Sequence, residues 1–102
     1  MHRSLIPLAL GALALAASPA WAADVAAGKK LAEDTCADCH GDDGKGDADV
    51  PGIAGMSVDK FTKAIKEYQA GTRTKSAKMA KEAKKLTDAD IANAAAYYAT
   101  LK

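Results

Sequence analysis

The sequence predicts an all-α fold, on the basis of three observations. Apolar residues recur at helical spacing in three segments, and no stretch of useful length alternates between apolar and polar residues. The second and third of these segments each begin at a residue type that commonly caps helices. Residues 41–55 contain five glycines, one proline and four aspartates, a composition typical of a loop. These observations favour one domain of three main helices joined by loops.

The first predicted helix precedes the loop and ends at Cys36. Its interior positions follow a helical spacing, at Val25, Gly28, Leu31, Ala32 and Thr35. The second helix is predicted to start after Ser57, its N-cap, and to end before Gly71. Its apolar positions are Val58, Phe61, Ile65 and Tyr68.

Residues 72–85 are rich in lysine and are predicted to form a connector without regular structure. The last helix opens at Thr87, and Asp90 lies three positions further on, which is a variant of the capping box. Its buried stripe is expected at Ile91, Ala94, Ala95, Tyr98 and Leu101.

Residues 1–22 are predicted to be a cleavable secretory signal peptide. One arginine precedes an uncharged run over 5–17, and Ala20-Trp21-Ala22 has the small-x-small pattern of a signal peptidase site. Cleavage after Ala22 leaves 23–102 as the mature domain. An uncleaved anchor is disfavoured, because the run is shorter than the roughly 20 residues of a membrane span and contains a proline and a glycine.

Removal of this segment leaves a domain with few large apolar residues. The full chain has 102 residues, whereas 23–102 has 80, with 13 basic and 13 acidic side chains. Of its 35 apolar residues, 18 are alanine and two are cysteine, so only 15 larger apolar side chains remain. Domains of this size often depend on a metal, disulfides or association for stability. The composition therefore predicts that another group fills part of the interior.

The charge balance disfavours nucleic-acid binding, which normally needs an excess of basic residues. The charges are distributed unevenly along the chain. Residues 24–59 carry nine acids and three lysines, whereas 60–102 carry four acids and ten basic residues. This dipole is expected to matter for docking to a partner protein.

The most specific motif is Cys36-Ala37-Asp38-Cys39-His40. Cysteines three positions apart on a helical turn face the same way, and the histidine adjoins the second cysteine. In the spacing C-x-x-C-H, two thiols can add to the vinyl groups of one haem, and the imidazole reaches the iron from the same side. Cys36 and Cys39 are therefore candidates for covalent attachment of one haem c, with His40 as an iron ligand.

Three other interpretations of the motif are weaker. Structural zinc needs four protein ligands, and 23–102 contains only three cysteine or histidine residues. A thioredoxin-like dithiol expects a preceding strand, and none is predicted here. A structural disulfide would close a very short loop and add little stability. Two free thiols are not expected to persist outside the cytosol, so the predicted export also favours cysteines that bind a cofactor.

With this motif, the chain from 24 to 102 resembles the small soluble class I cytochromes c of bacteria. The resemblance rests on four pieces in order: the first helix with Gly28, C-A-D-C-H-G at 36–41, P-G-I-A-G at 51–55, and Met79 followed by L-T-D-A-D-I at 86–91 and A-Y-Y at 96–98. Four-helix-bundle cytochromes differ, because their haem motif lies near the C-terminus. The resemblance implies a cytochrome c fold, three main helices plus loops wrapped around one covalent haem, and a periplasmic location.

The resemblance also implies a methionine opposite His40 on the iron. The candidates are Met56 and Met79, and Met79 stands where the family has its ligand, whereas Met56 stands where the family has a haem-packing residue. The Pro51 carbonyl is expected to accept a hydrogen bond from His40, and Gly28 to lie where the first and last helices cross, beside Tyr97 or Tyr98. The expected supports of the haem pocket are Pro51, Ile53, Met56, Phe61 and Tyr98.

The implied function is one-electron transfer between redox proteins rather than catalysis, with donors and acceptors such as an oxidase, a reductase or a dehydrogenase. Five lysines surround Met79 in sequence and are candidates for docking an acidic partner, namely Lys75, Lys78, Lys81, Lys84 and Lys85. A monomer that does not span the membrane is expected. The alternatives are a haem subunit of a larger periplasmic oxidoreductase and an open-site haem sensor or weak peroxidase. The latter lacks a visible acid–base pair, because His40 is the only histidine of 23–102.

Overall fold

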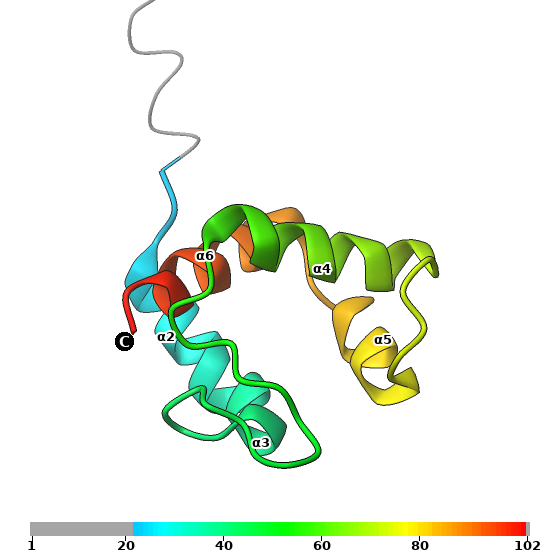
Figure 1. Ribbon diagram of the computed structural model, residues 1–102. Helices are drawn as coiled ribbons and strands as arrows, with labels where there is room; N and C mark the ends of the chain where they lie inside the picture. Colours follow the sequence, from blue (N-terminus) through cyan, green and yellow to red (C-terminus); the bar gives the residue numbers. More distant parts are fainter. Residues whose placement is uncertain (1–21, 102) are drawn as a thin grey trace, which may run out of the picture.

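The computed structural model describes residues 22–101, and all regular structure in this range is helical (Figure 1). The all-α prediction is therefore confirmed for these residues. The predicted signal peptide lies outside them, apart from its last residue, Ala22. None of the helices described between 22 and 101 has the length and apolar character needed to cross a bilayer.

The first helical region is longer than predicted. It consists of α2 (Val25–Leu31), the π-helical turn η2 (Ala32–Cys36) and α3 (Ala37–His40). The Asp24 side chain caps its start by accepting a hydrogen bond from the backbone N–H of Ala27. The prediction that this helix ends at Cys36 is wrong, because the chain stays helical until Gly41, which has a φ of +90°. The C-x-x-C-H motif is consequently helical throughout.

The other two predicted helices are confirmed together with their caps. Helix α4 (Val58–Ala70) begins after Ser57, whose side chain accepts from the Lys60 N–H, and ends at Gly71 in the left-handed conformation. Helix α6 (Asp88–Ala99) begins after Thr87, and Thr87 and Asp90 form a reciprocal capping box.

The connector over 72–85 contains a helix that the sequence interpretation missed. Helix α5 (Ala77–Ala83) begins after Ser76, whose hydroxyl accepts a hydrogen bond from the Met79 N–H at 3.1 Å. Its residues are alanine, lysine, methionine and glutamate, which are all good helix formers. Met79 therefore lies on a helix and not on an irregular loop.

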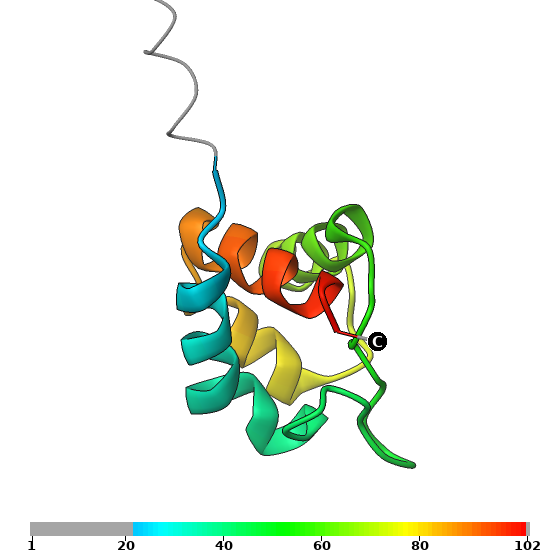
Figure 2. The same ribbon diagram turned by 90° about the vertical axis from the view of Figure 1, so that its left-hand side faces the viewer.

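Helices α2 and α6 cross at Gly28 (Figure 2). A Cβ atom at this position would lie 2.0 Å from the backbone oxygen of Asn93 and 3.0 Å from Cβ of Tyr97. The Asn93 side chain also accepts a hydrogen bond from the Asp24 N–H at 2.8 Å. The close crossing that the resemblance implies at Gly28 is present, and it requires a residue without a side chain.

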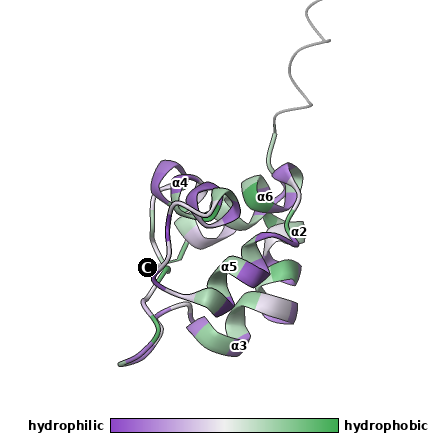
Figure 3. Cartoon of the chain, turned by 90° about the vertical axis from the view of Figure 1, so that its right-hand side faces the viewer, coloured by the Kyte–Doolittle hydropathy of each residue, from purple (hydrophilic) through white to green (hydrophobic). Residues whose placement is uncertain are grey.

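The core is small and half of its residues are alanine. The buried hydrophobic residues among those described are Ala32, Phe61, Ile65, Ala83, Ile91, Ala94, Ala95 and Tyr98. Helices α4 and α5 each carry hydrophobic and hydrophilic positions (Figure 3), as amphipathic helices do. Two of the predicted apolar positions face solvent instead, since Val25 is 43% and Val58 is 45% exposed. Leu101 lies beyond the end of α6 and is half-buried.

Candidate functional site

The imidazole of His40 is buried and is held by one hydrogen bond to the backbone. His40 is 9% exposed at the end of α3, and its Nδ1 lies 2.8 Å from the carbonyl oxygen of Pro51. Because a carbonyl oxygen only accepts hydrogen bonds, Nδ1 is the donor in this contact, and Nε2 is the ring nitrogen left to bind a metal. Within residues 22–101, no hydrogen bond to this Nε2 is found. The ring is therefore oriented as a metal-ligating histidine needs to be.

The loop after α3 brings Pro51 back to His40. The Asp47 carboxylate accepts hydrogen bonds from the N–H groups of Asp49 at 2.8 Å and Val50 at 2.9 Å, and these two bonds lower the pKa of Asp47. The Gly46 N–H donates to the carbonyl oxygen of His40 at 2.7 Å. Gly46 has a φ of +69°, and a Cβ there would lie 2.1 Å from the Val50 oxygen. The glycine and aspartate content of this loop thus serves to place the Pro51 carbonyl.

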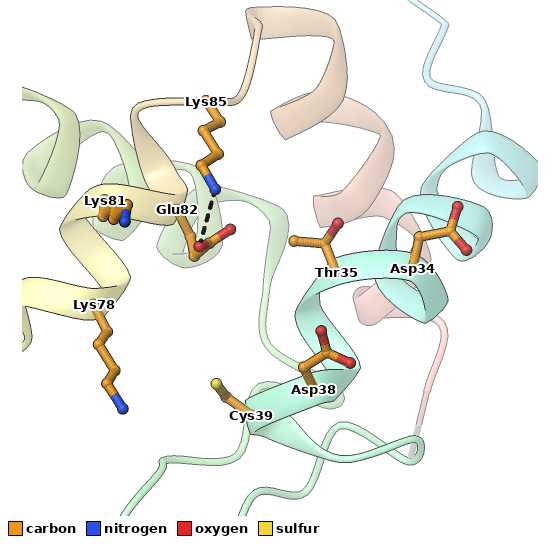
Figure 4. Close-up of a pocket in the computed structure, with 8 residues that line it drawn as sticks. All are labelled: Asp34, Thr35, Asp38, Cys39, Lys78, Lys81, Glu82 and Lys85. Carbon is orange, nitrogen blue, oxygen red and sulfur yellow. Dashed lines mark hydrogen bonds and ion pairs between the residues drawn. The ribbon is translucent and has the colours of Figure 1, made fainter.

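The two cysteines of the motif are free thiols in different surroundings. Cys36 is half-buried and packs against the core, where burial raises the pKa of its thiol and contact with the Tyr98 hydroxyl partly opposes this. Cys39 is exposed, and its sulfur points from α3 toward α5 (Figure 4). The motif therefore presents one thiol toward the interior and one toward the gap between two helices.

A cavity of about 470 Å³ separates the motif from α5 (Figure 4). Three of the predicted docking lysines line one wall, Lys78, Lys81 and Lys85, and Lys85 is paired with Glu82 at 3.3 Å. Lys75 and Lys84 are exposed but do not line this cavity.

The opposite wall is acidic and was not anticipated from the sequence. It is formed by Asp34 and Asp38, together with Thr35 and Cys39. The spacing of the two aspartates around Cys36, four positions apart on a helix, is the signal that could have revealed this wall. The cavity is therefore bordered on one side by Lys78, Lys81 and Glu82 of α5 with Lys85 just beyond it, and on the other by carboxylates on η2 and α3.

The predicted pocket residues fall into buried and half-buried groups. Phe61 and Tyr98 are buried and stack with ring centroids 5.7 Å apart, and burial raises the pKa of Tyr98. Ile53 and Met79 are half-buried and pack against the core. Met56 is also half-buried and lines a second cavity of about 350 Å³ along α4. Pro51 is exposed, so its contribution is the carbonyl that holds His40.

A protein-family model described as cytochrome c matches residues 25–102. The chain belongs to the cytochrome c family. The cytochrome c fold and the resemblance to small bacterial class I cytochromes c are thereby confirmed. Membership establishes electron transfer as the general function and covalently bound haem c as the cofactor of the family.

Two small cytochromes are similar over nearly their whole length. Cytochrome c-554(548) of Halomonas halodenitrificans is 42% identical over 82 residues, covering 78% of this chain and 98% of that protein. Cytochrome c-554(547) of Halothiobacillus neapolitanus is 34% identical over 91 residues, covering 79% of this chain and all of that protein.

Two solved structures with a similar fold are longer chains. Thiosulfate dehydrogenase of Marichromatium purpuratum superposes with a TM-score of 0.73 and 33% identity, over 76% of this chain but only 19% of that chain. Cytochrome c4 of Acidithiobacillus ferrooxidans superposes with a TM-score of 0.71 and 29% identity, over 78% of this chain and 50% of that chain. The same domain therefore occurs both by itself and within longer chains.

The residues of this cytochrome fit a covalently bound haem. Two free thiols lie three positions apart, and the adjoining histidine is fixed through Nδ1 with Nε2 left for a metal. Large apolar side chains pack against the core without being fully covered, among them Ile53, Met56, Tyr68, Met79 and Leu86. A flat apolar group lying against them would complete the interior that the 15 large apolar residues leave incomplete.

Proposed function

We propose that this chain is a periplasmic one-electron carrier and not an enzyme, with one haem c held by Cys36, Cys39, His40 and Met79. The observation that carries the proposal is the orientation of His40, whose Nδ1 is tied to Pro51 while Nε2 has no partner among the described residues. Export followed by cleavage after Ala22 would leave residues 23–102 in the periplasm as a monomer.

Each of the four residues has a distinct part. Cys36 and Cys39 anchor the group through thioether bonds, and His40 gives the iron a neutral nitrogen ligand whose basicity the Pro51 carbonyl increases. Met79 on α5 would supply the second protein ligand to the iron. When bound, the haem supplies a one-electron Fe(III)/Fe(II) couple, and methionine ligation favours a high reduction potential.

Met79 is better placed than Met56 for the role of the second ligand. The cavity of about 470 Å³ is lined by Asp38 and Cys39 of the helix that carries His40 and by Lys78, Lys81 and Glu82 of the helix that carries Met79, so these two helices face each other. His40 and Met79 are not among the residues that line it. Met56 instead shares a cavity with Lys60, Lys63 and Glu67 along α4. This arrangement supports Met79 as the ligand and Met56 as a packing residue.

The covalent attachment is tested with a double variant, C36S/C39S, expressed with the export segment. We expect the wild-type protein to have the mass of residues 23–102 plus one haem, and the double variant to retain no haem after denaturing extraction. Asp38→Ser, an exposed serine substitution between the two cysteines, is the matched control and should keep its haem. Haem that stays attached to the double variant, or a wild-type mass with no haem or two haems, would refute this attachment.

Docking through the lysine wall of α5 is a second testable part of the proposal. Replacing Lys78 and Lys81 with glutamate is expected to slow electron transfer to an acidic redox protein about tenfold at low ionic strength, because steering toward the partner is lost. The difference should shrink as salt is added. The matched control replaces Lys75 and Lys84, which are exposed but do not line the cavity. Equal rates for both double variants, or a rate independent of ionic strength, would argue against docking at this wall.

A role as the haem subunit of a larger oxidoreductase is the second candidate function. Two comparisons favour it, since a cytochrome subunit of sulfide dehydrogenase from Chlorobaculum tepidum is 36% identical over 67 residues, and a thiosulfate dehydrogenase contains the same fold. This chain covers 60% of the length of the former and 19% of the latter. A stoichiometric partner that copurifies from a periplasmic extract would support the subunit role over the free carrier.

A further inference from the structure

One side chain of α4 reaches the short turn between α5 and α6. The Nε2 of Gln69 donates to the carbonyl oxygens of Ala83 at 2.9 Å and Leu86 at 3.1 Å. Ala83 is the last residue of α5, and Leu86 immediately precedes Thr87, the N-cap of α6. A single amide group of α4 therefore bonds to both ends of the turn that leads from α5 to α6 (Figure 1).

The bond to Ala83 adds a tertiary hydrogen bond at a carbonyl that water does not easily reach. The last carbonyl groups of a helix have no intrahelical partner, and the Ala83 carbonyl oxygen accepts from the Leu86 N–H at 3.1 Å as well as from Gln69. Ala83 is fully buried, at 0% exposure, and Gln69 itself is half-buried. Among the hydrogen bonds between described residues, this is the only one that joins α5 to another helix. A helix of seven residues depends on such tertiary contacts for its position.

Met79 lies one helical turn before Ala83 and therefore on the same face of α5. Ala83 is buried and Met79 is half-buried, so this face is turned toward the interior. Whatever fixes the end of α5 at Ala83 also limits how far the Met79 side chain can move relative to the core against which it packs. The Ser76 cap stabilises the start of α5 but belongs to the same segment, so it cannot hold the helix in place.

We propose that Gln69 is a positioning residue that holds α5 so that Met79 stays bound to the iron. This inference rests on the proposed ligation by Met79. Without the two hydrogen bonds, α5 would leave its bound position more often, and an external ligand would compete better for the vacated iron site. Gln69 touches neither the iron nor its ligands, and it acts only through the placement of α5.

The test is a titration of the ferric holoprotein with imidazole, followed by optical spectroscopy. Gln69→Met keeps the length of the side chain but removes both donors, and we expect imidazole to bind about tenfold more tightly than to the wild type. Gln69→Asn, which keeps an amide on a shorter side chain, should give an intermediate affinity. It also provides a milder variant in case Gln69→Met does not fold.

The matched control is Ser57→Ala, which removes the N-cap of α4 without touching α5. It lowers the stability of the whole domain, so it should leave imidazole affinity at the wild-type value if Gln69 acts by positioning. Equal tightening in Ser57→Ala and Gln69→Met would overturn the proposal, because the effect would then reflect general stability. Wild-type affinity in Gln69→Met would overturn it as well.

The optical spectrum recorded before the titration tests ligation by Met79 separately from the positioning role of Gln69. A long-wavelength methionine–iron band in the wild type that Met79→Ala abolishes supports the ligation, and unchanged imidazole binding in Gln69→Met then refutes only the positioning role. If the wild type lacks the band, ligation by Met79 and the positioning role of Gln69 are both refuted.

Discussion

Substituting alanine for Gly28 is expected to lower the free energy of unfolding of the holoprotein by about 2 kcal/mol. The new Cβ would lie 2.0 Å from the Asn93 carbonyl oxygen and 2.5 Å from its carbon, and these backbone atoms cannot rotate away. Overpacking of this kind costs about 3 kcal/mol, against which the better helix propensity of alanine returns about 1 kcal/mol. Guanidinium unfolding followed by circular dichroism measures the difference.

Ala26→Leu is the control for this substitution. Ala26 is exposed on the same helix, two positions before Gly28, so a larger side chain there should change the stability by less than about 0.5 kcal/mol. A Gly28→Ala protein as stable as the wild type would show that α2 and α6 can separate without loss, contrary to the tight crossing seen here.

Replacing Met79 with alanine is expected to convert the electron carrier into a protein with an open iron site. The long-wavelength methionine–iron band should vanish and the reduced form should bind carbon monoxide rapidly, whereas the wild type should not. The reduction potential should fall by a substantial part of the roughly 0.8 V range that axial ligands span, because methionine ligation raises the potential. Optical spectra and potentiometry provide these readouts.

Met56→Ala is the matched control, because both methionines are half-buried and pack against the same core. It should keep the band and resist carbon monoxide. Loss of the band in Met56→Ala instead of Met79→Ala would assign the ligand to the other methionine. Rapid binding of carbon monoxide by the wild type would favour the open-site sensor over the carrier.

The features of the candidate site and its helices that depend on residues close together in the sequence are predictable from the sequence. The C-x-x-C-H spacing, the caps at Ser57 and Thr87 and the Gly71 terminus depend on neighbours a few residues away, and the caps and the terminus are seen in the structure as predicted. The hydrogen bond from His40 to Pro51 spans 11 residues, and it was anticipated only through the resemblance to a family.

Helix α5 shows the limit of the sequence pattern. Apart from alanine, Met79 is the only apolar residue of this helix, so no repeat of apolar positions is visible. Seven residues are also too few to identify a helix by periodicity. The mixed-charge cavity is not predictable for a related reason, since Asp34 and Asp38 lie at least 40 positions in sequence from the lysines that face them. Positions so far apart in the sequence do not indicate that η2 and α3 face α5.

The sequence by itself determined the helices that have caps, the loop rich in glycine and aspartate, and the cysteine and histidine chemistry, because each depends on short-range hydrogen bonds or on spacing within one turn. The tertiary structure alone decided the π-turn that carries Cys36, the placement of α5 by Gln69, and the acidic wall opposite the lysines. These features depend on the packing of a small, alanine-rich core, in which backbones approach closely at Gly28 and the Gln69 amide donates to two carbonyl groups of the turn between α5 and α6. Packing of this kind depends on all contacts of the core together, so it cannot be predicted from local sequence patterns and is seen only in the tertiary structure.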